Sequence, residues 1–509
     1  MSKGMKKIIF SLLFICIVGI VLFVNYYPHY YAFSQTPENK SYSGQASWFD
    51  PWDINNYFAM IKVSQKNRSL LLSNINTTES MRPALIYPLY TSIATIFPHA
   101  DNILLYHSLA ILCGLLLAIG IFVLSNMFVK KPLYSLYTLL IISLGGGLGF
   151  LFSAPDMSAD LHIPGVTFLS SFQKPHEAVA TLLYISSLVY FYFSIERKKL
   201  SHLWISIALF LLLIPIYPYR LLSFLLIVSL FAAIKGIRNQ KRYPVLYVGI
   251  FSAMIVPPTI LYTIHFLHSG FSVLTSYQPH QVTLSSLIFG YGFFFIFFVY
   301  QLFFSKNKSS AQLFLNIWIL VSIGLAIVPF GMSRLYLSGL LFPMALLFVL
   351  SLKNLSHIPN LFIYFMMMLS LIFILPTSFY TYHKRIEEVR SDNIWFYIPT
   401  SYQQSLDFLE DSEMDGVLAL PPLSSYIPAR TGKHVYFGIK DQSPGYDTKL
   451  AKAENFYSGT LSETKAQAFL QENNINLVVV PLHEVQFFAH SYPFLTVVYK
   501  NKDIEILSR

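Results

Sequence analysis

The sequence predicts an α-helical polytopic membrane protein with about eleven transmembrane helices and a small C-terminal α/β domain outside the membrane. Hydrophobic residues make up 54% of the 509-residue chain, whereas charged residues make up only 12%. Soluble domains contain about 25% charged residues, so an ordinary soluble protein is excluded. Apolar runs of roughly 17 or more residues recur along the chain, and about 20 are needed to cross the hydrocarbon core.

The apolar runs predict the individual spans. After MSKGMKK, the run Ile8–Val24 is long and no small-residue cleavage site follows it, so we expect a retained first helix. Between 201 and 234 the segment IPIYPYR interrupts one long run, which predicts two short, tilted helices joined by a Pro-containing turn. A re-entrant pair is the alternative there. The eleven predicted spans are 8–27, 104–129, 132–152, 177–195, 201–216, 219–234, 244–264, 284–304, 312–330, 335–352 and 358–379.

The basic residues between the spans predict the orientation of the chain. Membrane proteins concentrate Lys and Arg in their cytoplasmic loops. With a cytoplasmic N-terminus, those loops hold fifteen cations and a single acid, Glu196. The cations are Lys3, Lys6, Lys7, Lys130, Lys131, Arg197, Lys198, Lys199, Lys235, Arg238, Lys241, Arg242, Lys306, Lys308 and Lys353. We therefore expect a multi-pass protein of the plasma (inner) membrane with its C-terminal domain extracytoplasmic, and no nucleic acid as partner.

The composition changes after residue 380. This tail holds sixteen of the 25 acidic residues. It alternates helix-like stretches, such as SYQQSLDFLEDSE and SETKAQAFLQENN, with strand-like ones, such as GVLALP, INLVVVP and LTVVYK. We expect a membrane domain over residues 1–379, including a first outward loop over 28–103, and an α/β domain over 380–509.

The first outward loop carries the densest group of acids in the membrane domain. Asp50 and Asp53 lie three residues apart in FDPWDINNYFAMIKV. A carboxylate can deprotonate or orient an incoming hydroxyl, or bind a divalent cation such as Mg²⁺ or Mn²⁺. Trp52 and Tyr57 beside them offer flat apolar faces for a sugar ring. The alternative is structural: Asp53 is the N-cap of a helix and Asp50 is solvated.

A third acid follows in the same loop. Glu79 and Arg82 belong to TTESMRPALIYPLY, before the second predicted span. Glu79 could complete a site with Asp53. The alternative is a charge pair at the start of a helix.

Cations on the outward side suggest a phosphate site. Lys174 and His176, followed by Glu177, lie at the start of the fourth span, and a helix N-terminus suits a phosphate. Glu177 would then bind one of the two cations or cap the helix. Arg220 and Arg334 occupy other short outward connections. A charge at that depth usually has a partner, and Arg binds phosphate through two parallel hydrogen bonds. The alternative is snorkelling to the interface.

Several common catalytic motifs are missing from the sequence. It contains no GxxxxGK[ST], HExxH, GxSxG or GxGxxG motif, so ATP-driven transport and zinc or serine hydrolysis lack support. The glycine-rich stretch GGGLGF at 145–150 predicts close packing or a kink rather than phosphate binding.

Taken together, these features resemble the GT-C superfamily of integral-membrane glycosyltransferases, which use polyprenyl-phosphate-linked sugars. The topology is similar throughout. In the loop, D(x)₃YFAMI followed by NTTESMRPALIYPLY is similar to the acidic motif of the branch containing protein mannosyltransferases and aminoarabinose transferases. The stretches KPH at 174–176, IPARTGKHVYFG ending at Gly438, and NINLVVVPLHE after it are similar to uncharacterised bacterial members.

The resemblance implies an enzyme that transfers a sugar from a polyprenyl-phosphate donor to a glycan, lipid or protein acceptor within a lipid membrane. It implies that Asp53 activates the acceptor hydroxyl and that Glu79 is the second acid. Asp50 is either a helper or a bystander. The expected phosphate-binding residues are Arg220, Arg334, His176 and Lys174, and the expected sugar- or acceptor-binding residues are Trp52, Tyr57 and Arg82. The chain has DxxD where many members have adjacent acids or DxD, and this difference leaves the need for a metal open. The only cofactor expected is therefore an optional divalent cation.

The competing class is a polytopic transporter or lipid flippase without transferase activity. Such a protein needs ionisable groups along a path through the membrane. The predicted spans are nearly free of them, because the acids gather in loops. The sequence therefore favours the glycosyltransferase.

Overall fold

The computed structural model describes residues 3–152, 157–276, 281–305, 308–328, 332–355, 359–482 and 492–509. The chain forms two compact units. The first unit comprises Met1–Pro28, Leu109–Thr263 and Gln278–Glu387, and the second comprises His29–Ser108, Ile264–Tyr277 and Glu388–Arg509. The first outward loop therefore belongs to the same unit as the C-terminal residues. The predicted boundary at 380 lies inside a helix, α16.

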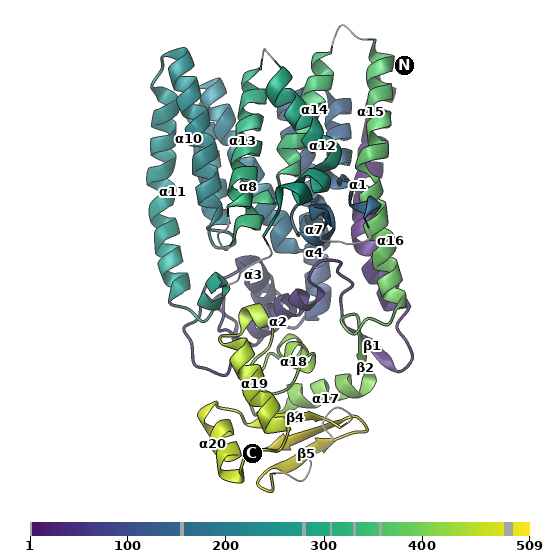
Figure 1. The fold of residues 1–509 in the computed structure, drawn as a ribbon, viewed down its shortest axis with the longest axis vertical. Helices are drawn as coiled ribbons and strands as arrows, with labels where there is room; N and C mark the ends of the chain where they lie inside the picture. The colour runs from purple at the N-terminus through teal and green to yellow at the C-terminus, as the bar shows by residue number, and fades with distance from the viewer. Residues whose placement is uncertain are drawn as a thin grey trace. The chain divides into compact units, whose positions relative to one another are not determined.

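The first unit is helical, and its long helices α10, α11, α13 and α15 run in nearly the same direction (Figure 1). Helix α8 packs against α9, α10 against α13, and α14 against α5, α12 and α13. The elements are α1 (Lys3–Ser34), α4 (Asn102–Val129), α5 (Pro132–Ser143), η1 (Gly149–Leu151), α6 (Ala159–His162), α7 (Phe168–Gln173), α8 (Pro175–Arg197), α9 (Leu200–Leu213), α10 (Arg220–Asn239), α11 (Tyr243–Leu267), α12 (Leu284–Phe304), α13 (Ser310–Ile327), η4 (Ser333–Leu337), α14 (Leu341–Asn354), α15 (Asn360–Ile374) and α16 (Pro376–Arg390). Of these, α1, α4, α11 and α16 also have residues in the second unit.

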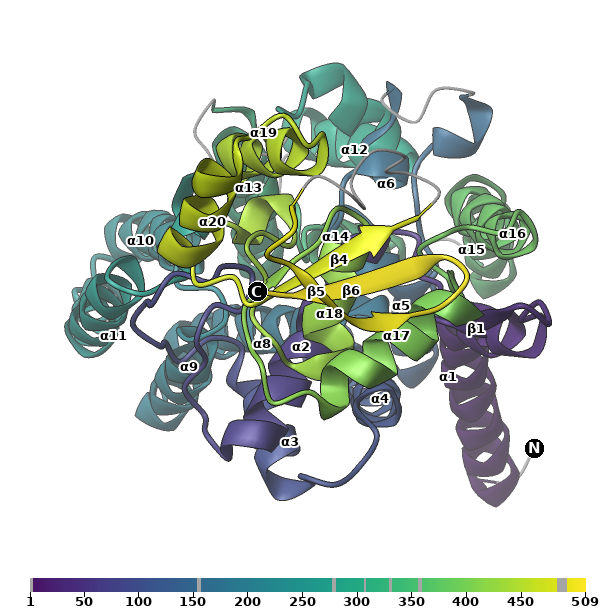
Figure 2. The same ribbon diagram turned by 90° about the horizontal axis from the view of Figure 1, so that it is seen from below.

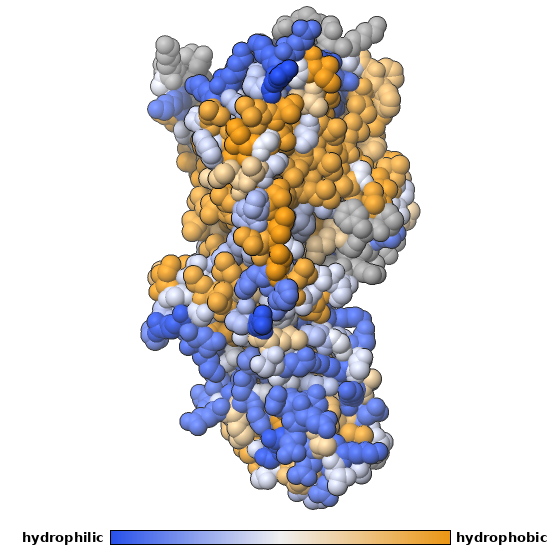
Figure 3. All heavy atoms as spheres, turned by 90° about the vertical axis from the view of Figure 1, so that its left-hand side faces the viewer, coloured by the Kyte–Doolittle hydropathy of each residue, from blue (hydrophilic) through white to orange (hydrophobic). Residues whose placement is uncertain are grey.

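The helices of the first unit match the predicted spans. Among the described residues, nine helical segments are long and apolar enough to cross a membrane, and α5 and α9 are shorter apolar helices. Figure 3 shows a broad apolar surface on this unit, as expected for side chains that face lipid. The apolar run 201–234 forms two helices joined by a turn, as predicted. The α-helical polytopic fold is confirmed.

One predicted span is wrong in its second half. The span 132–152 was expected to be one helix, but α5 ends at Ser143, before the glycine-rich stretch. A Cβ atom on Gly147 would lie 2.1 Å from the carbonyl oxygen of Phe289 in α12, so only glycine permits this approach. The backbone N–H of Leu148 donates to the same oxygen at 2.8 Å. The glycines therefore allow close packing, as expected, and α5 is shorter than the predicted span.

The second unit contains two small sheets and several short helices. Strand β1 pairs antiparallel with β2, and the four-stranded sheet has the order β3-β4-β6-β5, with only the β3–β4 pair parallel. The elements are β1 (Lys40–Tyr42), α2 (Pro51–Asn67), α3 (Pro88–Ile96), η3 (Ser272–Ser276), β2 (Tyr397–Pro399), α17 (Thr400–Asp411), β3 (Val417–Leu418), α18 (Leu423–Thr431), η5 (Lys440–Gln442), α19 (Tyr446–Tyr457), α20 (Glu463–Glu472), β4 (Leu477–Pro481), β5 (Thr496–Lys500) and β6 (Ile504–Ser508).

The four-stranded sheet separates two layers of helices. Successive side chains of a strand point to opposite faces. In β4, Val478 and Val480 share a core with α19 and α20, whereas Leu477 and Val479 share another with α17 and α18. Strands β4, β5 and β6 lie side by side in Figure 2. This arrangement confirms the predicted α/β domain. The last residues of NINLVVVPLHE, from 483 on, lie outside the described residues.

Helix α2 of the first outward loop packs against α18 within this unit. The amide nitrogen of Asn55 donates to Ser425 Oγ at 2.9 Å. At the start of α4, Asn102 Nδ2 donates to the carbonyl of Ala429 at 2.9 Å. Asn102 Nδ2 also donates to the carbonyl of Phe58 in α2 at 3.3 Å. Buried polar groups need such partners, so these bonds fix α2 against the C-terminal residues.

Replacing Gly416 with alanine should destabilise the second unit. Gly416 has φ +79°, and a Cβ atom there would lie 2.0 Å from the carbonyl oxygen of Asn474. The left-handed backbone costs a non-glycine residue about 1–2 kcal/mol, and overpacking adds about 1–3 kcal/mol. Gly445→Ala is the matched control, because its φ is +64° and nothing lies within 4 Å of its Cβ position. Thermal unfolding should give the lower Tm for Gly416→Ala, and equal Tm values would contradict the steric explanation.

Candidate functional site

Helix α2 carries Asp50 and Asp53 at its N-terminal end. Asp50 is the N-cap residue, with a left-handed backbone (φ 47°) and no capping hydrogen bond from its side chain. Pro51 follows at the first helical position, which suits its fixed φ. The alternative in which Asp53 caps the helix is therefore wrong: Asp53 lies inside the first turn. A carboxylate there is stabilised by the partial positive charge of the helix N-terminus.

A stack of buried tyrosines holds the Asp53 side chain. The Tyr57 hydroxyl, one helical turn further on, donates to Asp53 Oδ2 at 2.6 Å. The Tyr57 ring stacks on Tyr90 with ring centroids 5.1 Å apart, and it is nearly parallel to Tyr106 at 6.4 Å. Because these rings are buried, they fix the Tyr57 hydroxyl and hence one oxygen of the half-buried Asp53.

Trp52 and Arg82, the other expected acceptor-binding residues, are exposed. Trp52 meets Trp395 edge to face, with ring centroids 6.2 Å apart. Arg82 accepts a hydrogen bond at its carbonyl oxygen from the Gly270 N–H at 3.1 Å. The faces of Trp52 that Trp395 does not cover are open to a ligand.

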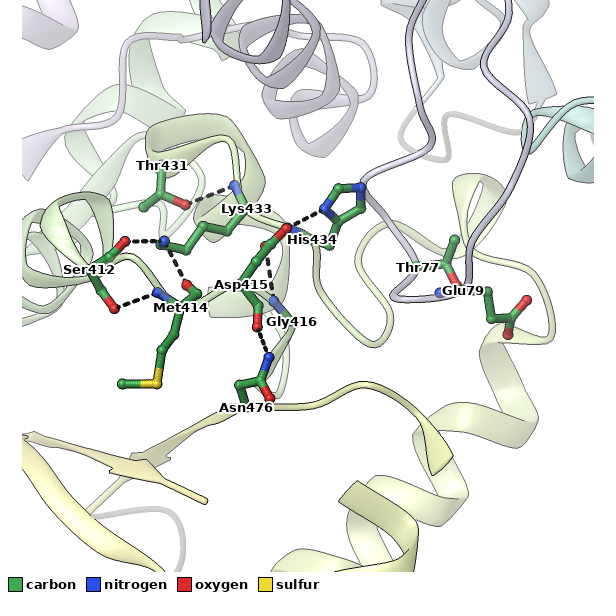
Figure 4. A network of polar contacts seen from close by, with 10 residues as sticks. All are labelled: Thr77, Glu79, Ser412, Met414, Asp415, Gly416, Thr431, Lys433, His434 and Asn476. Atoms are coloured by element: carbon green, nitrogen blue, oxygen red, sulfur yellow. Dashed lines mark hydrogen bonds and ion pairs between the residues drawn. The ribbon is translucent and has the colours of Figure 1, made fainter. Parts of the chain in front are cut away.

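Glu79 lies in an irregular segment, because the next helix, α3, begins only at Pro88. The alternative of a charge pair at a helix start is therefore wrong for Glu79 and Arg82. Glu79 Oε1 lies 2.7 Å from Lys449 Nζ in α19. Lys449 also donates to Thr77 Oγ1 at 2.8 Å, and the Glu79 N–H donates to the same hydroxyl at 3.2 Å (Figure 4 shows Thr77 and Glu79). Glu79 is thus bound to the C-terminal part of its unit.

In the first unit, Lys174 and His176 lie at the N-terminal end of α8. Lys174 is the N-cap residue and Pro175 begins the helix. Both Lys174 and His176 are buried. Glu177 Oε1 accepts a hydrogen bond from the Tyr217 hydroxyl at 2.5 Å and lies 4.0 Å from His176 Nε2. Of the two cations that Glu177 was expected to bind, Lys174 and His176, it therefore contacts His176.

Arg220 begins helix α10 and is only 2% exposed. Its guanidinium carbon lies 4.9 Å from the ring centroid of Tyr184 and 5.7 Å from that of Tyr219. Its Nη1 is buried and makes no hydrogen bond to any residue that the structure describes. Arg334, in η4, is 8% exposed. Such burial excludes the snorkelling alternative, in which the charged group reaches water.

Three tyrosines join the segments that carry these cations. The rings of His176 and Tyr217 lie 6.1 Å apart, those of Tyr217 and Tyr219 5.2 Å, and those of Tyr219 and Tyr336 6.1 Å. The Tyr336 hydroxyl also donates to the Tyr219 carbonyl at 3.3 Å. Tyr336 lies two residues after Arg334 in η4. The start of α8, the α9–α10 turn and η4 therefore meet inside the first unit.

One buried acid received no role from the sequence. Asp160 is buried and accepts hydrogen bonds from Ser158 Oγ (2.5 Å) and from the N–H groups of Gly147 (2.8 Å) and Gly149 (3.3 Å). It thereby holds the glycine-rich stretch in place. The sequence signal that could have pointed to Asp160 was a single acidic residue after the glycine-rich stretch.

Side chains that could bind a metal ion are not clustered among the described residues. In the part of the chain that the structure describes, no three His, Cys, Asp or Glu side chains lie close enough together to hold a metal ion. The loop carboxylates Asp50, Asp53 and Glu79 form no such group among the described residues.

Comparisons with known proteins support the fold. No known family and no curated protein matches the sequence. The oligosaccharyltransferase of Archaeoglobus fulgidus, in the apo form, has a TM-score of 0.60 and 12% identity over 95% of this chain and 70% of that chain. The archaeal oligosaccharyltransferase AglB from the same organism, in complex with an inhibitory peptide and a dolichol-phosphate, has a TM-score of 0.57 and 12% identity over 94% of this chain and 70% of that chain.

ArnT from Cupriavidus metallidurans, bound to undecaprenyl phosphate, has a TM-score of 0.51 and 11% identity over 100% of this chain and 98% of that chain. The chain therefore has the fold of the GT-C membrane glycosyltransferases, as the sequence predicts. At these identities the likeness defines the fold, and function has to be argued from the site.

Replacing Arg220 with methionine should not destabilise the protein. Apolar replacement of a poorly compensated buried charge is often neutral or stabilising by about 1–4 kcal/mol. Arg385→Met is the matched control: Arg385 is equally buried (2% exposed), but its Nη1 donates to the Asn25 carbonyl at 2.8 Å. Loss of a hydrogen bond to a charged group costs about 1.5–3 kcal/mol. Thermal unfolding in detergent should show a lower Tm for Arg385→Met only; equal losses would show that Arg220 is a structural residue.

Proposed function

We propose that the protein is a membrane glycosyltransferase that transfers a sugar from a polyprenyl-phosphate donor to an acceptor hydroxyl at the outer membrane face, with inversion. The fold shared with AglB and ArnT over nearly the whole chain supports the class, and those structures were solved with dolichol-phosphate and undecaprenyl phosphate. The observation that carries the proposal is the buried Arg220 guanidinium with its unsatisfied Nη1. A buried charge is costly unless it is paired, and a donor phosphate would supply the missing partner.

In this proposal the donor phosphate binds in the first unit. Arg220, Arg334 and Lys174 contribute positive charge, and His176 contributes an imidazole at the start of α8. The free N–H groups at that helix start also favour an anion. These groups would hold the charge that develops on the phosphate as it leaves.

The acceptor reacts at Asp53 in this proposal. The Asp53 carboxylate removes the proton of the acceptor hydroxyl, whose oxygen attacks the anomeric carbon opposite the phosphate. The bond between that carbon and the phosphate oxygen breaks, and polyprenyl phosphate leaves, which inverts the anomeric configuration. Asp50 and Glu79 assist as neighbouring acids. Exposed Trp52 and Arg82 contact the sugar or the acceptor, which is a glycan, a lipid or a protein.

We further propose that the protein lies in the plasma (inner) membrane with a cytoplasmic N-terminus and its second unit outside. The fifteen cations of the loops assigned to the cytoplasm support this orientation. Membrane lipid then surrounds the apolar helices of the first unit. No step in this scheme is assigned to a divalent cation.

Asp53→Asn should abolish turnover. The purified protein is supplied with a panel of polyprenyl-phosphate sugars, and release of polyprenyl phosphate is measured. General-base catalysis contributes about 10²–10⁴-fold, so kcat should fall by at least about 100-fold. Tyr57→Phe keeps the ring stack but removes the bond to Asp53, so kcat should fall by about tenfold or more.

Asp411→Asn, an exposed acid in α17, is the control and should retain wild-type turnover. Full turnover by Asp53→Asn would contradict the assignment of Asp53 as the catalytic base. If the wild-type protein releases no polyprenyl phosphate from any donor, the transporter or flippase alternative is favoured.

Arg220→Gln should weaken donor binding. The variant removes the charge and the paired donors of the guanidinium, and hydrogen bonds to charged groups are worth about 1.5–3 kcal/mol. The KM for the polyprenyl-phosphate donor should rise at least about tenfold, while the KM for the acceptor stays constant. Arg242→Gln, at an exposed arginine before α11, is the control. An unchanged donor KM in Arg220→Gln would contradict the phosphate site.

A further inference from the structure

The second unit contains a polar cavity of about 370 Å³. Its walls come from residues 73–81 of the first outward loop, residues 415–416 with His434, and residues 474–476. Two of these segments belong to the stretches IPARTGKHVYFG and NINLVVVPLHE, for which the proposed reaction has no role. Small-molecule sites span about 300–1,000 Å³, so the cavity has the size for a small ligand such as one sugar ring.

An aspartate–histidine pair forms one wall of the cavity, and the Thr77–Glu79 segment lies across from it in Figure 4. His434 Nδ1 and Asp415 Oδ2 are 2.7 Å apart. Asp415 Oδ1 accepts the N–H groups of Gly416 at 2.9 Å and His434 at 2.8 Å. With Nδ1 bound to the carboxylate, Nε2 is the ring nitrogen of His434 that this pair does not use.

The surrounding residues hold this pair rigidly. Lys433 is buried, and its Nζ donates to the carbonyls of Ser412 at 2.6 Å and Met414 at 2.7 Å, which fixes the chain just before Asp415. On the other side, Asn476 Nδ2 donates to the Asp415 carbonyl at 2.7 Å. Partial burial raises the pKa of Asp415, but the His434 hydrogen bond and charge and the two backbone N–H groups outweigh it and lower the pKa to about 2. Asp415 therefore remains a carboxylate.

Glu79 provides the acceptor on the facing wall. Its Oε1 is paired with Lys449 at 2.7 Å, and Lys449 in turn lies 5.2 Å from the ring centroid of Tyr436. Glu79 is about half exposed, at 48% of its side-chain surface. The side chain is therefore tethered to α19, and the residue lines the cavity with about half of its side-chain surface exposed.

The lining groups define the ligand they suit. Glu79 and Asp415 present acceptors, so the ligand must bring several donors. A phosphate or another anion would face two carboxylates and is disfavoured. A bare cation is also disfavoured, because Lys449 already pairs with Glu79, and no group of three metal-binding side chains occurs among the described residues. Neutral hydroxyl groups supply hydrogen-bond donors without adding a negative or positive charge, so they suit this lining.

We propose that this cavity binds a neutral saccharide unit, whose hydroxyl groups donate to Glu79 and Asp415 and form a hydrogen bond with His434. Met81 supplies an apolar surface in the same wall. Its role as a subsite for a glycan acceptor rests on the proposed function, whereas sugar binding itself needs no donor and no turnover. The proposal makes the acceptor a glycan or a glycosylated molecule.

The test measures binding to the full-length protein in nanodiscs by saturation-transfer NMR and calorimetry. The probes are neutral methyl hexosides, glucosamine, glucuronate, inorganic phosphate and Mn²⁺. At least one neutral methyl hexoside should bind, and His434→Gln should weaken it at least about tenfold, as expected for loss of the imidazole that Asp415 holds in the cavity wall. His268→Gln, at an exposed histidine of the same unit outside the cavity, is the matched control and should bind normally.

A second variant distinguishes a loss of binding from misfolding. Ser80 is exposed at the rim of the cavity, so Ser80→Trp should fill the cavity and abolish hexoside binding without changing the Tm. No binding of any neutral hexoside, or equal binding by His434→Gln and Ser80→Trp, would overturn the saccharide site. Binding of only glucosamine, glucuronate, phosphate or Mn²⁺ would also overturn it.

The two proposals can fail separately. If a hexoside binds in the cavity but no polyprenyl-phosphate sugar is turned over, the saccharide site stands and the transferase proposal fails. If polyprenyl phosphate is released but no neutral hexoside binds, the transferase stands and the saccharide site is overturned.

Discussion

The packing of helix α2 against helix α18 is the interaction on which the second unit depends. It joins a segment near residue 60 to one near residue 430, and it buries most of α2 between Ile54 and Gln65. A long connecting loop would normally be mobile and would hold its side chains loosely. Because α2 is built into a domain core, the carboxylate of Asp53 is presented from a rigid element, with a buried tyrosine to orient it. The polar cavity depends on the same assembly, since the first loop supplies one of its walls.

Arg220 differs from the acids of the cavity in how its charge is compensated. In the second unit, two acids that line the cavity have partners: Glu79 has Lys449, and Asp415 has His434. In the first unit, Arg220 is buried against tyrosine rings with one nitrogen unsatisfied. Aromatic faces attract a guanidinium but cannot accept its hydrogen bonds as an oxyanion does. A folded chain tolerates such a group when function requires it, at some expense of stability.

Local signals in the sequence were sufficient for the helical architecture. Long apolar runs define membrane helices, and the charge of the loops singled out Asp53, while Tyr57 lies one helical turn away. Contacts between distant residues were out of reach: Asn55 and Ser425 are 370 residues apart, and Lys449 and Thr77 are 372 apart. No local pattern shows that the first loop and the C-terminal residues share a core. The shortening of α5 likewise depends on the approach of Gly147 to α12.

Short elements in the second unit were missed for a different reason. Helix α18 contains Pro428 and follows two consecutive prolines, so its composition argues against a helix although its packing on α2 and α17 stabilises one. Asp160 was overlooked because a single acid carries no pattern. Its importance appears only when the N–H groups of Gly147 and Gly149 are found to donate to it.

The Asp415–His434 pair also bears on the environment that the second unit can tolerate. In the proposed orientation, the second unit meets the acidity of the cell's surroundings, which the cytoplasm does not buffer. The pKa of Asp415 is lowered from 3.8 to about 2, since the hydrogen bonds and charge that favour the ionised form outweigh the burial that opposes it. Its contribution to stability is therefore complete above about pH 4 and is lost only as the pH falls towards 2. The wall of the cavity would keep its charge in mildly acidic surroundings that protonate ordinary imidazoles.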